Sequence, residues 1–293
     1  MKGRVLSFSQ SASINRSIWM IAPALFLLIV FLLLPYVSIV IMSVREPAAG
    51  VPCGTGFTFA HYWHALSDSY VLLIIGRTLM IGVIVTMTTL LLGYPVAYHL
   101  AYSRSRWAGL LYVFVLSPLL VGVVVRTFSW LIILSRNGLV NQSLIALGLT
   151  GSPLPLVNNT LGVVIALTHV LLPFLILPLL GNLQAISPDL SLAARSLGAS
   201  RARAFFRVTL PLSIPGIQAG TVLVFVLAIS AYVTPAMLGG AGGRTMSVLI
   251  VQYLIESFRW PAGAALALIL AAIGIIAVAL YVNFLARVAR RLP

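Results

Sequence analysis

Six long apolar segments constrain this chain more than any other feature of its sequence. They cover residues 18–43, 72–102, 107–134, 159–182, 212–236 and 260–286. A helix needs about 20 apolar residues to cross the hydrocarbon of a bilayer, and each segment is that long. Because lipid offers the backbone no hydrogen-bond partner, such segments cross as helices. The sequence therefore predicts an all-α membrane protein with six transmembrane helices.

Composition agrees with this prediction and excludes other classes. Only 8% of the residues are charged, whereas a soluble domain has about 25%. The net charge of +14 does not indicate nucleic-acid binding, because the arginines are scattered between apolar segments instead of gathering on one face. The single cysteine, Cys53, excludes an internal disulfide and any cysteine-based metal cluster.

The N-terminal region reads as a tail followed by an uncleaved first span. Residues 1–17 are polar and basic, and the apolar run begins at Ile18. A signal peptide would have small residues after its apolar core, but here Ala22 and Ala24 precede the main run. We therefore expect a tail over 1–17 and one transmembrane domain over 18–293.

The distribution of positive charge predicts the orientation. With the N-terminus in the cytoplasm, 12 of the 18 basic residues lie on the cytoplasmic side, and three of the four acids lie outside. Cytoplasmic loops carry the excess of Lys and Arg. Both termini are therefore expected to be cytoplasmic, in a multi-pass protein of the bacterial inner membrane.

The cytoplasmic loop 183–211 has the signals of a helical hairpin. Ser187 is a good N-cap, Pro188 fits the first helical position, and Asp189 favours the positive end of the helix dipole. Gly198 is a typical residue just after a helix end. Ser200 begins a second short helix that ends near Pro211.

One face of the first hairpin helix is apolar, and the hairpin is basic. Leu190, Ala193, Ala194 and Leu197 share a face by their i, i+3, i+4, i+7 spacing. Four arginines accompany them: Arg195, Arg201, Arg203 and Arg207. The residues alone leave two interpretations open, namely docking on an acidic partner and an interfacial helix lying on anionic headgroups.

The spacing in this loop resembles the cytoplasmic signature of ABC importer permeases. That signature is Glu-Ala-Ala, three residues, Gly, nine residues, then Ile-x-Leu-Pro. Here Ala193 and Ala194 are followed by three residues, Gly198, nine residues, and Val208-Thr209-Leu210-Pro211. Two residues depart from it: Leu192 stands in place of Glu, which removes a carboxylate, and Val208 replaces Ile.

Two further strings resemble permeases of the spermidine/putrescine type. One is Val123-Val124-Val125-Arg126-Thr127-Phe128-Ser129-Trp130, followed by Arg136-Asn137-Gly138. The other runs from Tyr232-Val233-Thr234-Pro235 to Gly240. They favour the first of the two permease subunits of such systems. The leading substrate is therefore a polyamine. Relatives in this group also carry opines and aminophosphonates, so opines, amino acids and aminophosphonates are the alternatives.

The resemblance implies a type I ABC importer permease fold and a set of partners. The partners are a second homologous permease, a periplasmic substrate-binding protein and two ATP-binding subunits that dock at residues 188–211. It also implies that Ala193, Ala194 and Gly198 form the docking surface and that Leu210 and Pro211 set the return into the fifth span. Closure of the two ATPases would then rock the spans between inward-open and outward-open states.

No catalytic, cofactor-binding or metal site is expected in this chain. The phosphate-loop pattern G-x-x-x-x-G-K-[ST] is absent from the sequence, so ATP hydrolysis would fall to other subunits. The four histidines are dispersed; His61 and His64 fit a partner-facing loop better than a metal site.

Four residues are candidates for the substrate path. Arg126 lies near the outer end of the third span, where it could instead extend to the headgroups. Tyr232 and Thr234 offer aromatic and polar contacts at the outer end of the fifth span. Glu256 is a carboxylate near a span end, although it could pair with Arg259.

Two other function classes fit the sequence less well. An ion-coupled secondary transporter usually carries acids or histidines within its spans, and no span interior here holds an acid. An intramembrane enzyme would need a nucleophile with a base, or a metal motif.

Overall fold

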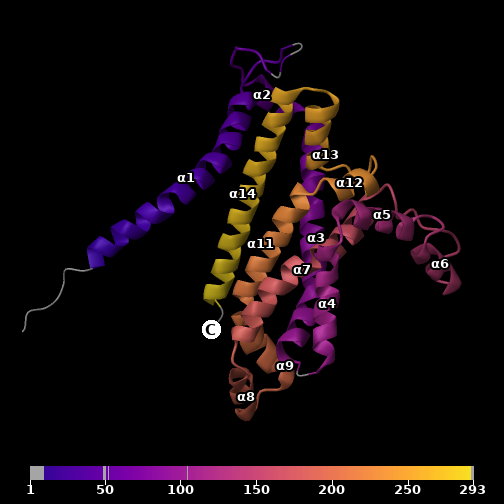
Figure 1. Cartoon of the computed structure of the whole chain (residues 1–293). Helices are drawn as coiled ribbons and strands as arrows, with labels where there is room; N and C mark the ends of the chain where they lie inside the picture. Colours follow the sequence, from indigo (N-terminus) through magenta and orange to yellow (C-terminus); the bar gives the residue numbers. More distant parts are fainter. Residues whose placement is uncertain (1–9, 49–50, 52, 104, 292–293) are drawn as a thin grey trace, which may run out of the picture.

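The chain folds into helices that run the length of an elongated bundle (Figure 1). The computed structural model describes all residues except 1–9, 49–50, 52, 104 and 292–293. Most of the predicted tail 1–17 and Arg104 thus lie outside the described residues. In chain order the main helices are α1 Gln10–Ser43, α2 Ala60–Ser67, α3 Ser69–Tyr102, α4 Trp107–Leu120, α5 Val123–Leu134, α6 Leu139–Ala146, α7 Thr160–Ala185, α8 Pro188–Ser196, α9 Arg201–Ala204, α10 Leu210–Leu212, α11 Ile214–Ser230, α12 Val233–Leu238, α13 Met246–Val251 and α14 Trp260–Arg291. Two π-helical turns, η1 Phe205–Thr209 and η2 Gln252–Glu256, connect α9 to α10 and α13 to the turn before α14.

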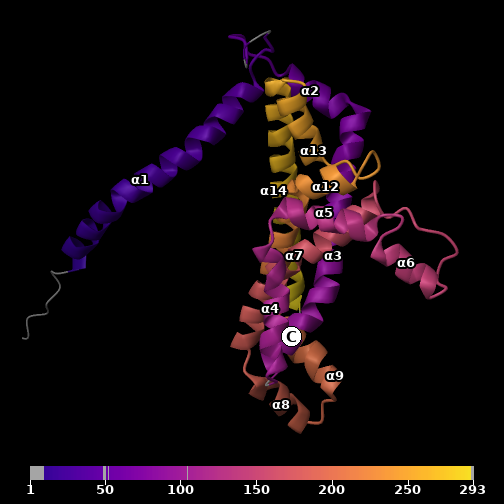
Figure 2. The same ribbon diagram turned by 45° about the vertical axis from the view of Figure 1, so that its right-hand side comes forward.

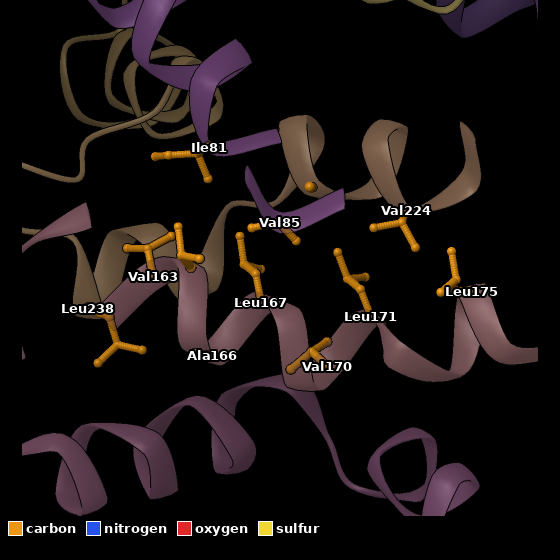
Figure 3. Close-up of a cluster of buried hydrophobic side chains, with 12 residues drawn as sticks. Ile81, Val85, Val163, Ala166, Leu167, Val170, Leu171, Leu175, Val224 and Leu238 are labelled. Carbon is orange, nitrogen blue, oxygen red and sulfur yellow. The ribbon is translucent and has the colours of Figure 1, made fainter. Parts of the chain in front are cut away.

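The core forms where α3, α7 and α11 pack together. Ile81 and Val85 of α3 and Val224 of α11 point toward a row of α7 side chains that includes Leu167, and all of these are buried (Figure 3). Glycine allows the helices to approach closely: a Cβ on Gly220 of α11 would lie 3.0 Å from the carbonyl oxygen of Leu175. Small residues at such crossings are typical of membrane helices, whose association depends on close van der Waals packing.

Several helices have the length and composition of membrane spans. Within the described residues there are five, or six when the bent pair Arg201–Leu212 and Ile214–Ser230 counts as one span. In the apolar part of α1, Ala22–Ser43, no residue of the most apolar stretch is buried, and only Ser43 at its end is. In both views α1 leans away from the other helices, starting from the end of the bundle that carries α2 (Figures 1 and 2). The prediction of an all-α fold with this set of apolar helices is confirmed.

The structure differs from the sequence prediction in the third segment. Residues 107–134 were expected to form one span, but the chain is extended at Val121 and Gly122 and divides the segment into α4 and α5. The cause lies in the sequence: Pro118 lacks an amide hydrogen, and Gly122 weakens the helix at the same point. Helix α4 has 14 residues, which is short of the ~20 that a span requires.

The glycine-rich segment 239–243 is ordered by side chains from distant parts of the chain. Two groups hold it. Thr160 donates to the carbonyl of Gly242 (2.9 Å), and Arg77 donates to that of Ala241 (2.8 Å). A Cβ on Gly239 would lie 2.5 Å from the Pro235 oxygen. Glycine therefore serves here to allow close packing of backbone on backbone.

We expect Gly220→Val to destabilise the bundle by about 1–3 kcal/mol, the cost of overpacking a helix crossing. The added methyl groups would meet the α7 backbone at Leu175. The matched control is Gly181→Val on α7, where a Cβ meets nothing within 4 Å. Thermal unfolding in detergent would compare the two, and equal melting temperatures would contradict the assigned contact.

Candidate coupling and translocation sites

The hairpin begins with the predicted cap. The Ser187 hydroxyl accepts from the amide of Asp189 (3.3 Å), Pro188 is the first helical residue, and Asp189 lies in the first turn of α8. These contacts satisfy amide groups that would otherwise have no partner at the helix start. In both views α8 and α9 lie at the end of the bundle opposite α2 (Figures 1 and 2).

Gly198 ends α8 in a Schellman motif. Its φ is +89°, its amide donates to the carbonyl of Arg195 (3.0 Å), and the next amide, of Ala199, donates to that of Ala194 (3.1 Å). A residue with a side chain is disfavoured at this φ. Space does not restrict the position, because a Cβ there would meet nothing within 4 Å. Gly198 is therefore required for backbone conformation, and it fixes the direction in which the chain leaves α8.

The predicted apolar face of α8 is largely open. No residue of α8 is buried, and Leu197, which caps its C-terminal end, is 90% exposed. Leu190 and Ala193 are also exposed, whereas Ala194 is half-buried. The four hairpin arginines are also exposed. A hairpin with exposed leucines and exposed arginines offers a surface suited to another macromolecule.

The return segment bends sharply before α11. Pro211 has no amide hydrogen and cannot continue the α-helical ladder, and the preceding residues Phe205–Thr209 form the π-helical turn η1. The segment Arg201–Leu212 meets α11 at 61°. Leu210 and Pro211 are half-buried at this bend. Ser213 is fully buried there and donates to the Leu210 carbonyl (2.8 Å).

Aromatic side chains of α3 contact the return segment. The ring of Phe205 lies edge-to-face with those of Tyr94 (5.9 Å between centroids) and Tyr98 (5.6 Å). The Tyr94 hydroxyl is 3.1 Å from the Ser213 hydroxyl. A cavity of about 870 Å³ opens beside these residues and is also lined by Tyr102.

Leu192, the residue that replaces the signature carboxylate, is 53% exposed. It lines a smaller cavity of about 190 Å³ together with Tyr98 and Tyr102 of α3, Val208 and three hydroxyl-bearing residues. The departure from the signature thus falls at a cavity that the hairpin shares with the C-terminal end of α3.

The path candidates do not converge on one site. On α5, the Arg126 guanidinium donates from Nη1 to the carbonyl of Pro118, at the break after α4. Thr234 of α12 is 3% exposed, and its hydroxyl lies 3.3 Å from that of Thr127 on α5. Arg126 and Thr234 thus hold neighbouring elements, and their packing gives each a structural role.

The other two candidates lie elsewhere. Tyr232 lines an apolar cavity of about 800 Å³ between α11, α13 and α14. Glu256 ends η2 and is exposed, as is Arg259, whose backbone amide donates to the Tyr253 carbonyl (2.8 Å). Neither residue shares a cavity with Arg126.

The aromatic contact between Phe205 and the C-terminal end of α3 was not predicted from the sequence. The tyrosines at 94, 98 and 102 are spaced i, i+4, i+8, which places them on one helix face. That spacing was available in the sequence, but it could not indicate which element packs on the face.

The comparisons with known proteins identify the chain. The family model described as binding-protein-dependent transport system inner membrane component matches residues 89–290, and the chain belongs to this family. It is therefore a permease subunit of an ABC importer, a multi-pass inner-membrane component and not an enzyme.

Individual relatives agree with this family. The spermidine/putrescine transport system permease protein PotB of Haemophilus influenzae is 31% identical over 241 residues, covering 82% of this chain and 84% of its own length. The molybdenum transport system permease protein ModB of Mycobacterium bovis is 33% identical over 194 residues, covering 66% and 72%. A bacterial alginate ABC transporter, solved in complex with its alginate pentasaccharide-bound periplasmic protein, has the same fold: TM-score 0.71, 17% identity, 96% of this chain and 98% of that one.

We expect Arg126→Met to lower the stability of the subunit by about 1–3 kcal/mol, the cost of leaving a buried carbonyl without its donor. Unfolding in detergent would measure it, with the exposed Arg136→Met as the matched control. A variant with unchanged stability and lost transport would instead assign Arg126 to the substrate path.

Proposed function

We propose that this chain forms half of the translocation pathway of an ATP-driven importer for polyamines such as putrescine and spermidine. A second, homologous permease supplies the other half, giving a heterodimer. A periplasmic binding protein delivers the solute, and two ATPase subunits dock at residues 188–211. In this proposal both termini and the hairpin lie in the cytoplasm.

The observation that carries the proposal is the uncovered surface of α8. Among the described residues this apolar face is largely uncovered and the four hairpin arginines are exposed, a combination that fits a protein groove with carboxylates at its edge. The Schellman turn at Gly198 holds the helix end in a fixed direction. A connector that only joined two spans would not need a capped helix with such an end.

A docked hairpin would give the ATPases a defined mechanical effect. Closure of the two ATPases would move both hairpins, one on each permease. Because Leu210 and Pro211 continue into α11 through a fixed bend, the movement would reach the core helices. The permease would thereby alternate between two packed arrangements, each favoured by a different state of the ATPases.

Polyamine is the substrate best supported, by the relatives named for spermidine/putrescine transport and by two sequence strings that resemble permeases of that type. The chain itself contains four acids in 293 residues, so it offers few carboxylates to a cation. The second permease and the binding protein would therefore supply most of the charge selectivity. Arg126, Tyr232, Thr234 and Glu256 remain proposed contacts of the path.

We expect Gly198→Glu to uncouple transport from ATP hydrolysis. A side chain at φ +89° strains the end of α8, and the added carboxylate sits in the docking surface. In the reconstituted complex, stimulation of ATP hydrolysis by the loaded binding protein should fall by about tenfold, as expected for a loss of roughly 1.4 kcal/mol of coupling.

The matched control for this variant is Gly148→Glu. Gly148 has a φ of +68° and open space around it, but it lies just after α6. It combines the same strain and the same charge at a position remote from the hairpin. Unchanged stimulation in Gly198→Glu, or an equal loss in Gly148→Glu, would count against docking at α8.

Transport in proteoliposomes tests the function as a whole. Uptake of radiolabelled spermidine should require both ATP and the binding protein. Uptake driven by an ion gradient alone would favour a secondary transporter. A binding screen of the partner periplasmic protein against polyamines, opines, aminophosphonates and amino acids would decide the substrate class, and selective binding of any other class would replace polyamine in the proposal.

A further inference from the structure

The hairpin contacts the core helices at a second place besides its covalent link to α11. Phe205, the first residue of η1, lies edge-to-face against Tyr94 and Tyr98 of α3, with interplanar angles of 87° and 82°. Edge-to-face pairs at this separation are favourable beyond the area that they bury. The hairpin is thereby attached to α3 as well as to α11.

Tyr94 contacts the return segment at two points, one before its bend and one at the bend. Its ring meets Phe205 before the bend, and its hydroxyl lies 3.1 Å from that of Ser213 at the bend. Ser213 is fully buried and has a second bond, to the Leu210 carbonyl. A change of the 61° bend would therefore have to break this pair or carry Tyr94 with it.

The helix that receives this contact is central to the bundle. Helix α3 packs extensively on both α7 and α11, and the tyrosines belong to the same unbroken helix as the buried Ile81 and Val85. A displacement of the C-terminal part of α3 would move the core helices α7 and α11, because closely packed helices transmit movement.

We propose that Phe205 and Tyr94 are positioning residues that transmit the movement of the hairpin to α3. Phe205 transmits it through its ring, and Tyr94 through its ring and its bond to Ser213. This inference rests on the proposed function, because the movement originates in an ATPase docked at α8. It assigns a role to residues outside the docking surface.

Hydrogen exchange of the full complex tests the proposal without depending on the substrate. The complex contains this chain, the second permease and both ATPases, and exchange is compared with and without ATP. In the unmodified complex, ATP should change the exchange of the hairpin 188–200 and of the α3 segment 91–102. Phe205→Leu should keep the hairpin response and reduce the α3 response by roughly three- to tenfold, within the range known for residues along coupled elements.

Two further variants separate the ring from the hydroxyl. Phe205→Tyr keeps an aromatic ring and should retain the α3 response. Tyr94→Phe keeps the ring contact and removes the bond to Ser213, so the α3 response should fall by about twofold. If the complex with Phe205→Leu fails to assemble, the α3 response of Tyr94→Phe tests the proposal instead. This variant removes a single oxygen atom and keeps the ring.

The matched control is Phe31→Leu, the same substitution on α1, at a side chain that is 77% exposed. It should leave both responses unchanged. An intact α3 response in Phe205→Leu, or an equal loss in Phe31→Leu, would overturn the inference while the proposed function stands. An unmodified complex that binds no ATPase, or whose hairpin does not respond to ATP, would overturn both.

Discussion

Backbone carbonyls inside the apolar body of this chain must find donors within the protein, and the architecture depends on this constraint. Where α4 ends, the chain becomes extended and the Pro118 carbonyl is satisfied by the Arg126 guanidinium of the next helix. Buried threonine hydroxyls need an acceptor for the same reason and find it within their own helix. Thr86 and Thr221 donate to carbonyls four residues earlier, at 2.7 and 2.6 Å.

The sequence predicts most of the fold because the lipid bilayer sets the length and the composition of each helix that spans it. The helices α3 and α7 lie where the apolar segments begin and end to within a few residues, whereas α11 stops at Ser230, before the predicted end of the fifth span at 236. The break at Val121 and Gly122 was missed because a proline within a span is usually tolerated, and whether it interrupts the helix depends on a donor elsewhere. The order of the glycine segment 239–243 is not predictable for a related reason: its partners, Arg77 and Thr160, are remote in sequence.

Individual residues of the candidate coupling site could be predicted where short-range rules determine the structure. The cap at Ser187 and the turn at Gly198 follow from short-range chemistry, and both have the expected geometry. What surrounds the hairpin was not predictable, because the partner of Phe205 lies about 110 residues away and only the folded helices bring them together. The candidates for the path were selected by chemistry alone, and the structure distributes them over separate places.

The uncovered leucines of α8 have a consequence for the life of the subunit before assembly. Leu197 is 90% exposed, and α8 has no buried residue among the described residues. A subunit without a partner at this surface would expose apolar side chains, which chaperones and proteases recognise. If an ATPase docks there as proposed, its supply would limit how much of this protein accumulates in a cell, and the ratio of the subunits would be maintained without a dedicated regulator.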